Sequence, residues 1–176
     1  MLSCLPMTPL TLFSEIMKSI DLVTEYIARL TALILIVLTM LVVYDALSRY
    51  LFHSGSIALQ ELEWHLFDFV ILLGIAYALK EGAHVRVDIF YGNFQVKTKA
   101  FVDLFSQFFL ILPFSLLIIY MGFDFVLQSF VQNEGSCDPG GLPYRFIVKS
   151  LMLLSFALLI LQSLSEIIKR IKELRS

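Results

Sequence analysis

Three ionisable side chains share one face of an apolar segment that begins near residue 60. Glu61, His65 and Asp68 recur at spacings of four and three in the stretch QELEWHLFDFV, which places them on one side of a helix. Carboxylates and an imidazole in this arrangement can relay protons or hold a cation. A charged side chain inside a membrane helix costs about 2.5 to 3.5 kcal/mol on insertion scales, so these groups require partners or a polar cavity.

A charged pair, Asp45 and Arg49, precedes this stripe in the chain. The acid lies four residues before the base, the order that favours an ion pair on one helix face. Consecutive membrane helices would bring the pair and the stripe to the same surface. We therefore predict one structural polar network of Asp45, Arg49, Glu61, His65 and Asp68. The alternatives are a self-contained pair near the outer surface and a proton or cation site.

The histidines are a poor match to cofactor chemistry. A b-type haem anchor requires two imidazoles that face each other, but His53, His65 and His84 are predicted at different depths. The single Glu-x-x-His, formed by Glu81 and His84, lacks the second copy that a di-iron bundle requires. We predict no catalytic residue, no metal site and no cofactor. A haem-binding membrane anchor of a respiratory oxidoreductase remains the alternative function.

These residues are set in a strongly apolar chain. Of its 176 residues, 59% are hydrophobic and 16% are charged, with a mean hydropathy of +0.84, whereas soluble domains carry about 25% charged residues. Four stretches match the roughly 20 residues that a helix needs to cross a bilayer, and they cover residues 29–51, 62–79, 100–127 and 144–168. We predict an all-α integral membrane protein with residues 1–176 as a single domain. The formal net charge of −2 gives no reason to expect nucleic acid.

Two features are predicted to lie at the membrane interface. Apolar residues recur at helical spacing over residues 13–28, with charged residues on the other side. This pattern predicts an amphipathic interfacial helix that feeds the first span, and a partly disordered tail is the alternative. Trp64, at the start of the second span, is predicted to anchor that helix at the interface, as tryptophan commonly does.

The basic residues indicate an orientation. With four spans, both termini and the loop at 80–99 share one side, which holds Lys18, Arg29, Lys80, Arg86, Lys97, Lys99, Lys169, Arg170, Lys172 and Arg175. The other side has only Arg49, Arg145 and Lys149. Short cytoplasmic loops carry an excess of lysine and arginine, so we predict that both termini are cytoplasmic.

A series of short motifs connects the first two spans with the loop after them. The residues are Arg49-Tyr50, Glu61 and Glu63, Gly74 and Ala76, and then Gly82, His84, Arg86 and Asp88. In this order and spacing the chain resembles the small membrane subunits of the tripartite ATP-independent periplasmic (TRAP) transporters, the DctQ-like family. The last group forms a signature loop. It would lie at the inner headgroup boundary, or would fix the loop against its own helix ends or a partner.

The resemblance implies a role within a larger assembly in the bacterial inner membrane. The chain would be a non-catalytic small permease subunit that scaffolds a large TRAP membrane subunit. That partner would hold the substrate and sodium sites and would perform the movement. A periplasmic substrate-binding protein would deliver an organic acid. The resemblance thus implies sodium-coupled uptake in which this chain has no substrate site or cofactor of its own.

Overall fold

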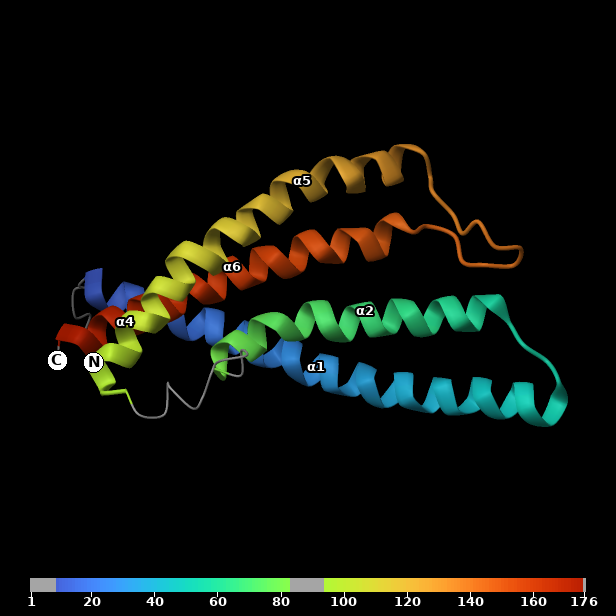
Figure 1. The fold of residues 1–176 in the computed structure, drawn as a ribbon, viewed down its shortest axis with the longest axis horizontal. Coiled ribbons are helices and arrows are strands. Elements are labelled where there is room, and N and C mark those ends of the chain that lie inside the picture. The colour runs from blue at the N-terminus through green and yellow to red at the C-terminus, as the bar shows by residue number, and fades with distance from the viewer. Residues whose placement is uncertain (1–8, 83–93, 176) are drawn as a thin grey trace, which may run out of the picture.

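The computed structural model describes residues 9–82 and 94–175, which are helical apart from loops and turns (Figure 1). The elements in chain order are α1 (Pro9–Phe52), α2 (Ile57–Lys80), α4 (Val96–Ser106), the π-helical segment η1 (Gln107–Ile111), α5 (Leu112–Val131) and α6 (Phe146–Arg175). Four helical stretches are long and apolar enough to cross a membrane, with α4, η1 and α5 forming one of them. The all-α membrane fold is therefore confirmed.

Helix α1 differs from the predicted division into an interfacial helix and a first span. Residues 13–28 are helical, but they continue into the span without a break, so α1 has 44 residues. No glycine or proline occurs between Pro9 and Phe52, and nothing in the sequence therefore ends the helix at residue 28. At 1.5 Å per residue α1 is about 66 Å long, twice the hydrocarbon thickness. Its N-terminal third must tilt or project beyond the membrane core.

The other spans differ from the predicted bounds mainly at their ends. Helix α2 begins at Ile57, five residues before the predicted start, and ends at Lys80. Helix α6 begins at Phe146 rather than beside Pro143, because Tyr144 has a positive φ of 64° that breaks the helical path. The same helix extends to Arg175, beyond the predicted end at residue 168.

The third span contains a local π-helix where a kink is predicted from Pro113. Proline lacks an amide hydrogen and its ring clashes with the carbonyl one turn earlier, so the regular hydrogen-bond ladder cannot continue. The chain accommodates this by widening into η1, which ends at Ile111, two residues before Pro113. The Ser115 hydroxyl donates to the Ile111 carbonyl at 2.6 Å, which satisfies one acceptor in the altered region. Helical structure is therefore continuous from Val96 to Val131.

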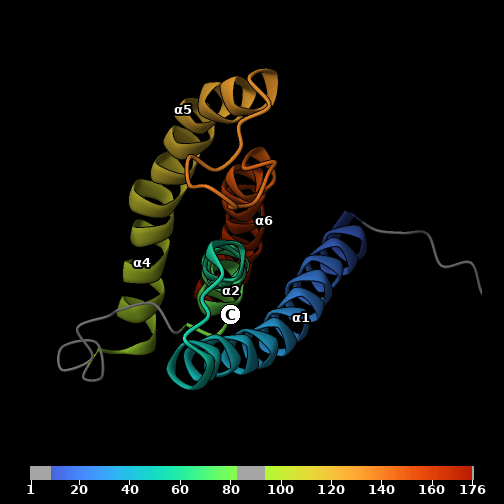
Figure 2. The same cartoon turned by 90° about the vertical axis from the view of Figure 1, so that its right-hand side faces the viewer.

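The helices form an open row rather than a closed bundle. Helix α2 packs against α1 on one side and α6 on the other, α5 packs on the far side of α6, and α1 also contacts α6 directly. Figures 1 and 2 show this order, α1, α2, α6, α5, with the start of α1 and the end of α6 at the same end of the molecule. We call this the terminal end. The opposite end, with the loops 53–56 and 132–145, is called the loop end.

Burial is inverted relative to a soluble protein. The most completely buried side chains are polar or small, and they include Gln162 and Ser115, both at 0% exposure. Large apolar side chains point outward along every span, for example Tyr120 at 81% and Phe52 at 75%. Membrane helices pack through small residues because lipid supplies no hydrophobic drive for association. This pattern is what a helical protein surrounded by lipid or by membrane partners requires.

Gly122 sets the close approach of α5 to α6. Ser115, Gly122 and Ser129 are buried at intervals of seven along α5, on one face. A Cβ atom on Gly122 would lie 2.6 Å from Met152 Cε and 3.1 Å from Leu153 Cδ2. The two helices therefore have little room for a side chain at this position.

We expect Gly122→Leu to lower the free energy of unfolding by about 2 kcal/mol, because overpacking would push α5 away from α6. The measurement is titration of the detergent-solubilised protein from dodecyl maltoside into dodecyl sulfate, followed by circular dichroism. Met121→Leu, on the exposed neighbouring position, is the control and should behave as wild type. Equal midpoints for both variants would show that the contact at Gly122 contributes nothing.

Candidate functional site: polar clusters at the two ends of the helix row

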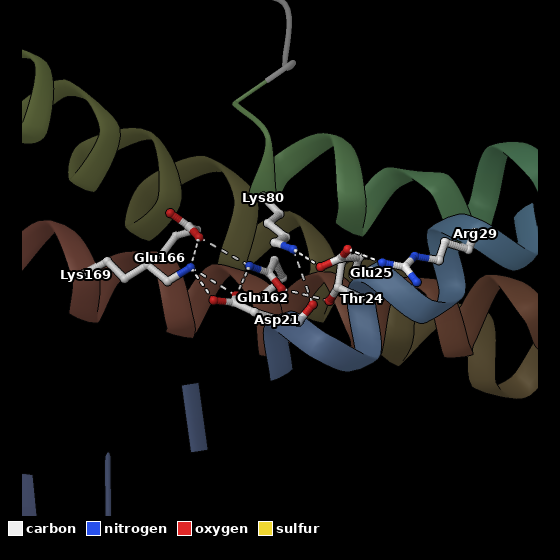
Figure 3. A network of polar contacts seen from close by, with 8 residues as sticks. All are labelled: Asp21, Thr24, Glu25, Arg29, Lys80, Gln162, Glu166 and Lys169. Carbon is white, nitrogen blue, oxygen red and sulfur yellow. Dashed lines mark hydrogen bonds and ion pairs between the residues drawn. The ribbon is translucent and has the colours of Figure 1, made fainter. Parts of the chain in front are cut away.

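A polar cluster joins three helices at the terminal end (Figure 3). We call it the terminal cluster, and it consists of Asp21, Thr24, Glu25, Arg29, Lys80, Gln162, Glu166 and Lys169. Its members come from α1, α2 and α6, and its contacts join residues as far as 148 positions apart in the sequence. The cluster therefore fixes the relative positions of these helices at one end of the row.

Gln162 is the centre of the terminal cluster. Its amide oxygen accepts a hydrogen bond from Thr24 Oγ1 at 2.8 Å, and its amide nitrogen donates to Asp21 Oδ1 at 3.0 Å and Glu166 Oε1 at 3.3 Å. The side chain is fully buried. A buried amide that lost these partners would keep its desolvation cost. The contact of α1 with α6 therefore depends on the hydrogen bonds that Gln162 makes to Thr24 and Asp21.

Two lysines neutralise the acids around this amide. Lys169 Nζ lies 2.9 Å from Asp21 Oδ2 and 2.6 Å from Glu166 Oε1. Lys80 Nζ, at the end of α2, lies 3.5 Å from Glu25 Oε2 and donates to the Asp21 carbonyl at 3.4 Å. Each lysine thus links α1 to another helix. Ion pairs of this kind commonly brace charged groups at membrane-helix ends.

The third span is tied to α6 at the same end. The Ser163 hydroxyl donates to Gln107 Oε1 at 3.1 Å, and Gln107 is a buried residue of η1. About two turns after Ser163 on α6, Arg170 Nε lies 3.3 Å from Asp103 Oδ2. The π-helical segment therefore presents a buried polar side chain to α6, and all the spans are cross-linked by polar contacts at the terminal end.

Glu61 is the centre of a different cluster at the loop end. Its carboxylate accepts hydrogen bonds from the Leu142 amide at 2.5 Å, from Arg145 Nη2 at 3.0 Å and from the Ser136 hydroxyl. Gly141 makes this possible, since a Cβ atom there would approach Glu61 Oε2 to 2.7 Å. One side chain of α2 therefore holds the loop 132–145 against the end of the row.

A second ion pair stabilises the same loop. Lys149 Nζ, in the first turn of α6, lies 2.5 Å from Glu134 Oε2, and the Arg145 amide donates to the Glu134 carbonyl at 2.9 Å. The hydrogen bond from Lys149 holds the pKa of Glu134 below its usual value. Both basic residues at the start of α6 therefore have acidic partners.

Asp45 and Arg49 form the predicted ion pair, but they do not join Glu61. The pair lies between α1 and α2, where the Asp45 side chain is 6% exposed. The Gln60 amide oxygen, in the orientation assigned from its hydrogen bonding, accepts from Arg49 Nη1 and Nη2 at 2.5 and 2.6 Å. Asp45 Oδ1 and Glu63 Oε1 are buried, and neither accepts a hydrogen bond within the described residues.

The structure thus differs from the predicted single network of Asp45, Arg49, Glu61, His65 and Asp68. The reason is the position of α2 between α1 and α6. Neighbouring residues of a helix point about 100° apart, so Gln60 reaches α1 whereas Glu61 reaches the start of α6. Two separate clusters result.

His65 and Asp68 lie on the α6 side of α2, as their spacing from Glu61 predicts. They line an open cavity of about 440 Å³ at the loop end, between α2 and the start of α6. Trp64, 74% exposed, also lines it. Among residues 9–82 and 94–175, no hydrogen bond or ion pair reaches the side chain of Asp68. The predicted role of Trp64 as an interfacial anchor stays a prediction.

The signature loop falls largely outside the described residues. Of its members only Gly82 is described, with a positive φ of 65° directly after α2. Glycine adopts this conformation without steric cost, so Gly82 is suited to turn the chain at the helix end. His84, Arg86 and Asp88 lie outside the described ranges, and their two interpretations stay open.

The terminal cluster is not predicted by the sequence patterns. The spacing over residues 13–28 places Asp21 and Glu25 on the charged side of an interfacial helix, and it predicts no contact between them and Gln162. A signal was present, because Gln162, Glu166 and Lys169 form a polar stripe at spacings of four and three in an otherwise apolar segment. Such a stripe predicts a polar partner but does not tell which helix supplies it.

Most polar groups of the terminal cluster and of the cluster around Glu61 are paired by hydrogen bonds or ion pairs within the chain, so these clusters stabilise the helix packing. Together with the four apolar helical stretches and the outward-facing apolar side chains, they define a multi-pass helical membrane protein. Residues 38–173 match the family described as tripartite ATP-independent periplasmic transporters, DctQ component. Because the match covers most of the chain, the protein belongs to this family of TRAP transporter small permease subunits, which are non-enzymatic transport components.

A relative supports the same assignment. The chain is 35% identical over 77 residues to a protein of Haemophilus influenzae whose name describes it as a TRAP transporter small permease protein. The aligned region covers 44% of this chain and 45% of the relative. The chain therefore matches less than half of that relative's length, whereas the family match covers three of the four apolar stretches in full and part of the first.

Proposed function

We propose that this chain is the non-catalytic scaffold of a sodium-coupled TRAP transporter that imports an organic acid. The observation that carries the proposal is the combination of braced ends with outward-facing apolar residues. Each end of the row is held by its own polar contacts, at Gln162 and at Glu61, so the helices form a stable layer. Such a layer can hold a larger membrane protein in place without moving itself.

The proposed assembly has two further components. A large TRAP membrane subunit holds the substrate and sodium sites and packs on the apolar faces of the row, and a periplasmic substrate-binding protein delivers the substrate. Both termini lie in the cytoplasm and the complex resides in the bacterial inner membrane. Basic residues such as Lys80, Lys169 and Arg170 gather at the terminal end, which supports this orientation. This chain needs no cofactor in that role.

A haem-binding anchor has no support from the comparisons. The matching family and the relative are both described as transport components. Of the described histidines, His53 lies in the loop after α1 and His65 lies on α2 beside the cavity. Neither placement provides the pair of facing imidazoles that bis-histidine ligation requires.

The test of the proposed function is reconstitution with the protein encoded beside this chain. We expect the neighbouring genes to encode a large multi-span protein and a secreted binding protein. The two membrane proteins should purify together, and proteoliposomes should take up substrate only with both proteins, the binding protein and a sodium gradient. Uptake by liposomes that contain this chain alone would contradict the scaffold role.

A further inference from the structure

The open cavity at the loop end contains an acidic group that the fold does not use. Asp68 lines it together with Glu61, Trp64, His65, Arg145 and Lys149. Arg145 is paired with Glu61, and Lys149 with Glu134. Both basic residues of the wall are therefore neutralised from within the chain, whereas Asp68 has no ion-pair or hydrogen-bond partner within the described ranges.

Asp68 lies deep in the predicted membrane span, where a carboxylate without a partner is unusual. Helix α2 rises about 29 Å from Glu61 to Lys80, which matches the hydrocarbon thickness of about 30 Å. Lys80 belongs to the terminal cluster and Glu61 holds the loop 132–145, so both ends of this interval lie at polar surfaces. Asp68 lies two helical turns, about 10 Å, inside the Glu61 level. An uncompensated carboxylate at this depth is costly and marks a functional position.

The size and the surroundings of the cavity indicate what fills it. A volume of about 440 Å³ is far larger than a single ion and accommodates a long side chain. Ile57, Trp64 and Val148 also line the cavity and supply an apolar surface near the charged group. A charged centre with an apolar and aromatic rim is the usual form of a protein interface. A phospholipid headgroup stays at the bilayer surface, well outside the Asp68 level.

We propose that the cavity between α2 and α6 is a docking site for a lysine or arginine side chain carried by a membrane helix of the large subunit, with Asp68 as its ion-pair partner. This inference rests on the proposed scaffold role and names the surface that performs it. The incoming cation neutralises Asp68, and the aromatic face of Trp64 excludes water from the pair. The interaction specifies the register of the two proteins as well as their association.

The test is co-purification of the wild-type chain and its variants with the large subunit. Asp68→Asn should reduce the recovered complex roughly tenfold, because it leaves the partner's cation buried without a counter-charge. The thermal stability of the isolated variant should equal that of wild type, since Asp68 makes no bond within the part of the chain that the structure describes. Asp68→Glu should restore most of the complex. The matched control is Glu15→Gln on the exposed part of α1, which should leave the yield unchanged.

Photo-crosslinking identifies the occupant directly. A benzoylphenylalanine at Val148, on the cavity wall, should crosslink to a peptide of the large subunit that contains lysine or arginine. The same probe at Ile36, on the exposed surface of α1, is the control for proximity to lipid. Crosslinks from Val148 to phospholipid alone, or full complex yield with Asp68→Asn, would overturn the docking site. Absence of any complex with the wild-type chain would instead contradict the proposed function itself.

Discussion

Replacing Gln162 with leucine will lower the free energy of unfolding by about 2 kcal/mol. Leucine has a similar volume, so the substitution leaves the packing of α6 nearly unchanged. It removes the acceptor of Thr24 and a donor to both Asp21 and Glu166. These groups are then left with fewer partners where water is scarce, and the contact of α1 with α6 weakens.

The measurement for Gln162→Leu is the unfolding midpoint in dodecyl sulfate, with Gln128→Leu as the matched control. Gln128 is exposed on α5, so the same chemical change there should be neutral or slightly stabilising in detergent. A site-specific crosslink between the N-terminal part of α1 and α6 should also form more slowly in the Gln162 variant. If both glutamine variants unfold at the wild-type midpoint, the terminal cluster does not brace the row.

Replacing Glu61 with alanine will release the loop 132–145 from the end of the row. The substitution leaves the Leu142 amide, the Arg145 guanidinium and the Ser136 hydroxyl without their shared acceptor. Arg145 is a cleavage site for trypsin, and its side chain is held by Glu61 in the wild-type protein. We expect cleavage after Arg145 to become roughly tenfold faster, because proteolysis follows local opening.

Limited proteolysis in detergent, followed by mass spectrometry, measures the rate at this bond. Ser136→Ala should have a smaller effect, since it removes only one of the donors. Glu15→Ala, which changes an exposed acid on α1, should leave the rate unchanged. A Glu61→Ala variant that resists trypsin as well as wild type would show that other contacts hold the loop.

The two predictions concern different functions of the same row. Gln162 lies at the terminal end and holds α1 on α6, whereas Glu61 lies at the loop end and holds the α5–α6 connection. Loss of either contact should reduce assembly with the large subunit indirectly, through the stability of this chain. Asp68 is expected to act on assembly alone, because the described part of the fold makes no use of its charge. Comparing the three positions therefore separates scaffold stability from partner recognition.

Local patterns in the sequence determined the elements that depend on local chemistry. Blocks of apolar residues predicted the membrane helices, because a backbone in lipid must satisfy its hydrogen bonds within the helix. Pro113 predicted a disturbance of the third span, and the structure places η1 there. The Asp45–Arg49 spacing predicted an ion pair, which is present. The spacing of residues 13–28 predicted a helix, but this helix is not a separate element, because no glycine or proline interrupts the chain between Pro9 and Phe52.

Only the tertiary structure decided which polar groups meet. The spacing of Glu61, His65 and Asp68 placed them on one face of α2. It did not determine which helix this face contacts. Glu61 binds Arg145 and the loop before α6, and Gln162 binds Thr24 and Asp21, all separated by long stretches of chain. Helical periodicity is a property of one segment, whereas these pairings depend on how α2 packs against α6 at the loop end and on the direct contact of α1 with α6 at the terminal end. Those contacts follow from side-chain packing between helices, which no single segment encodes.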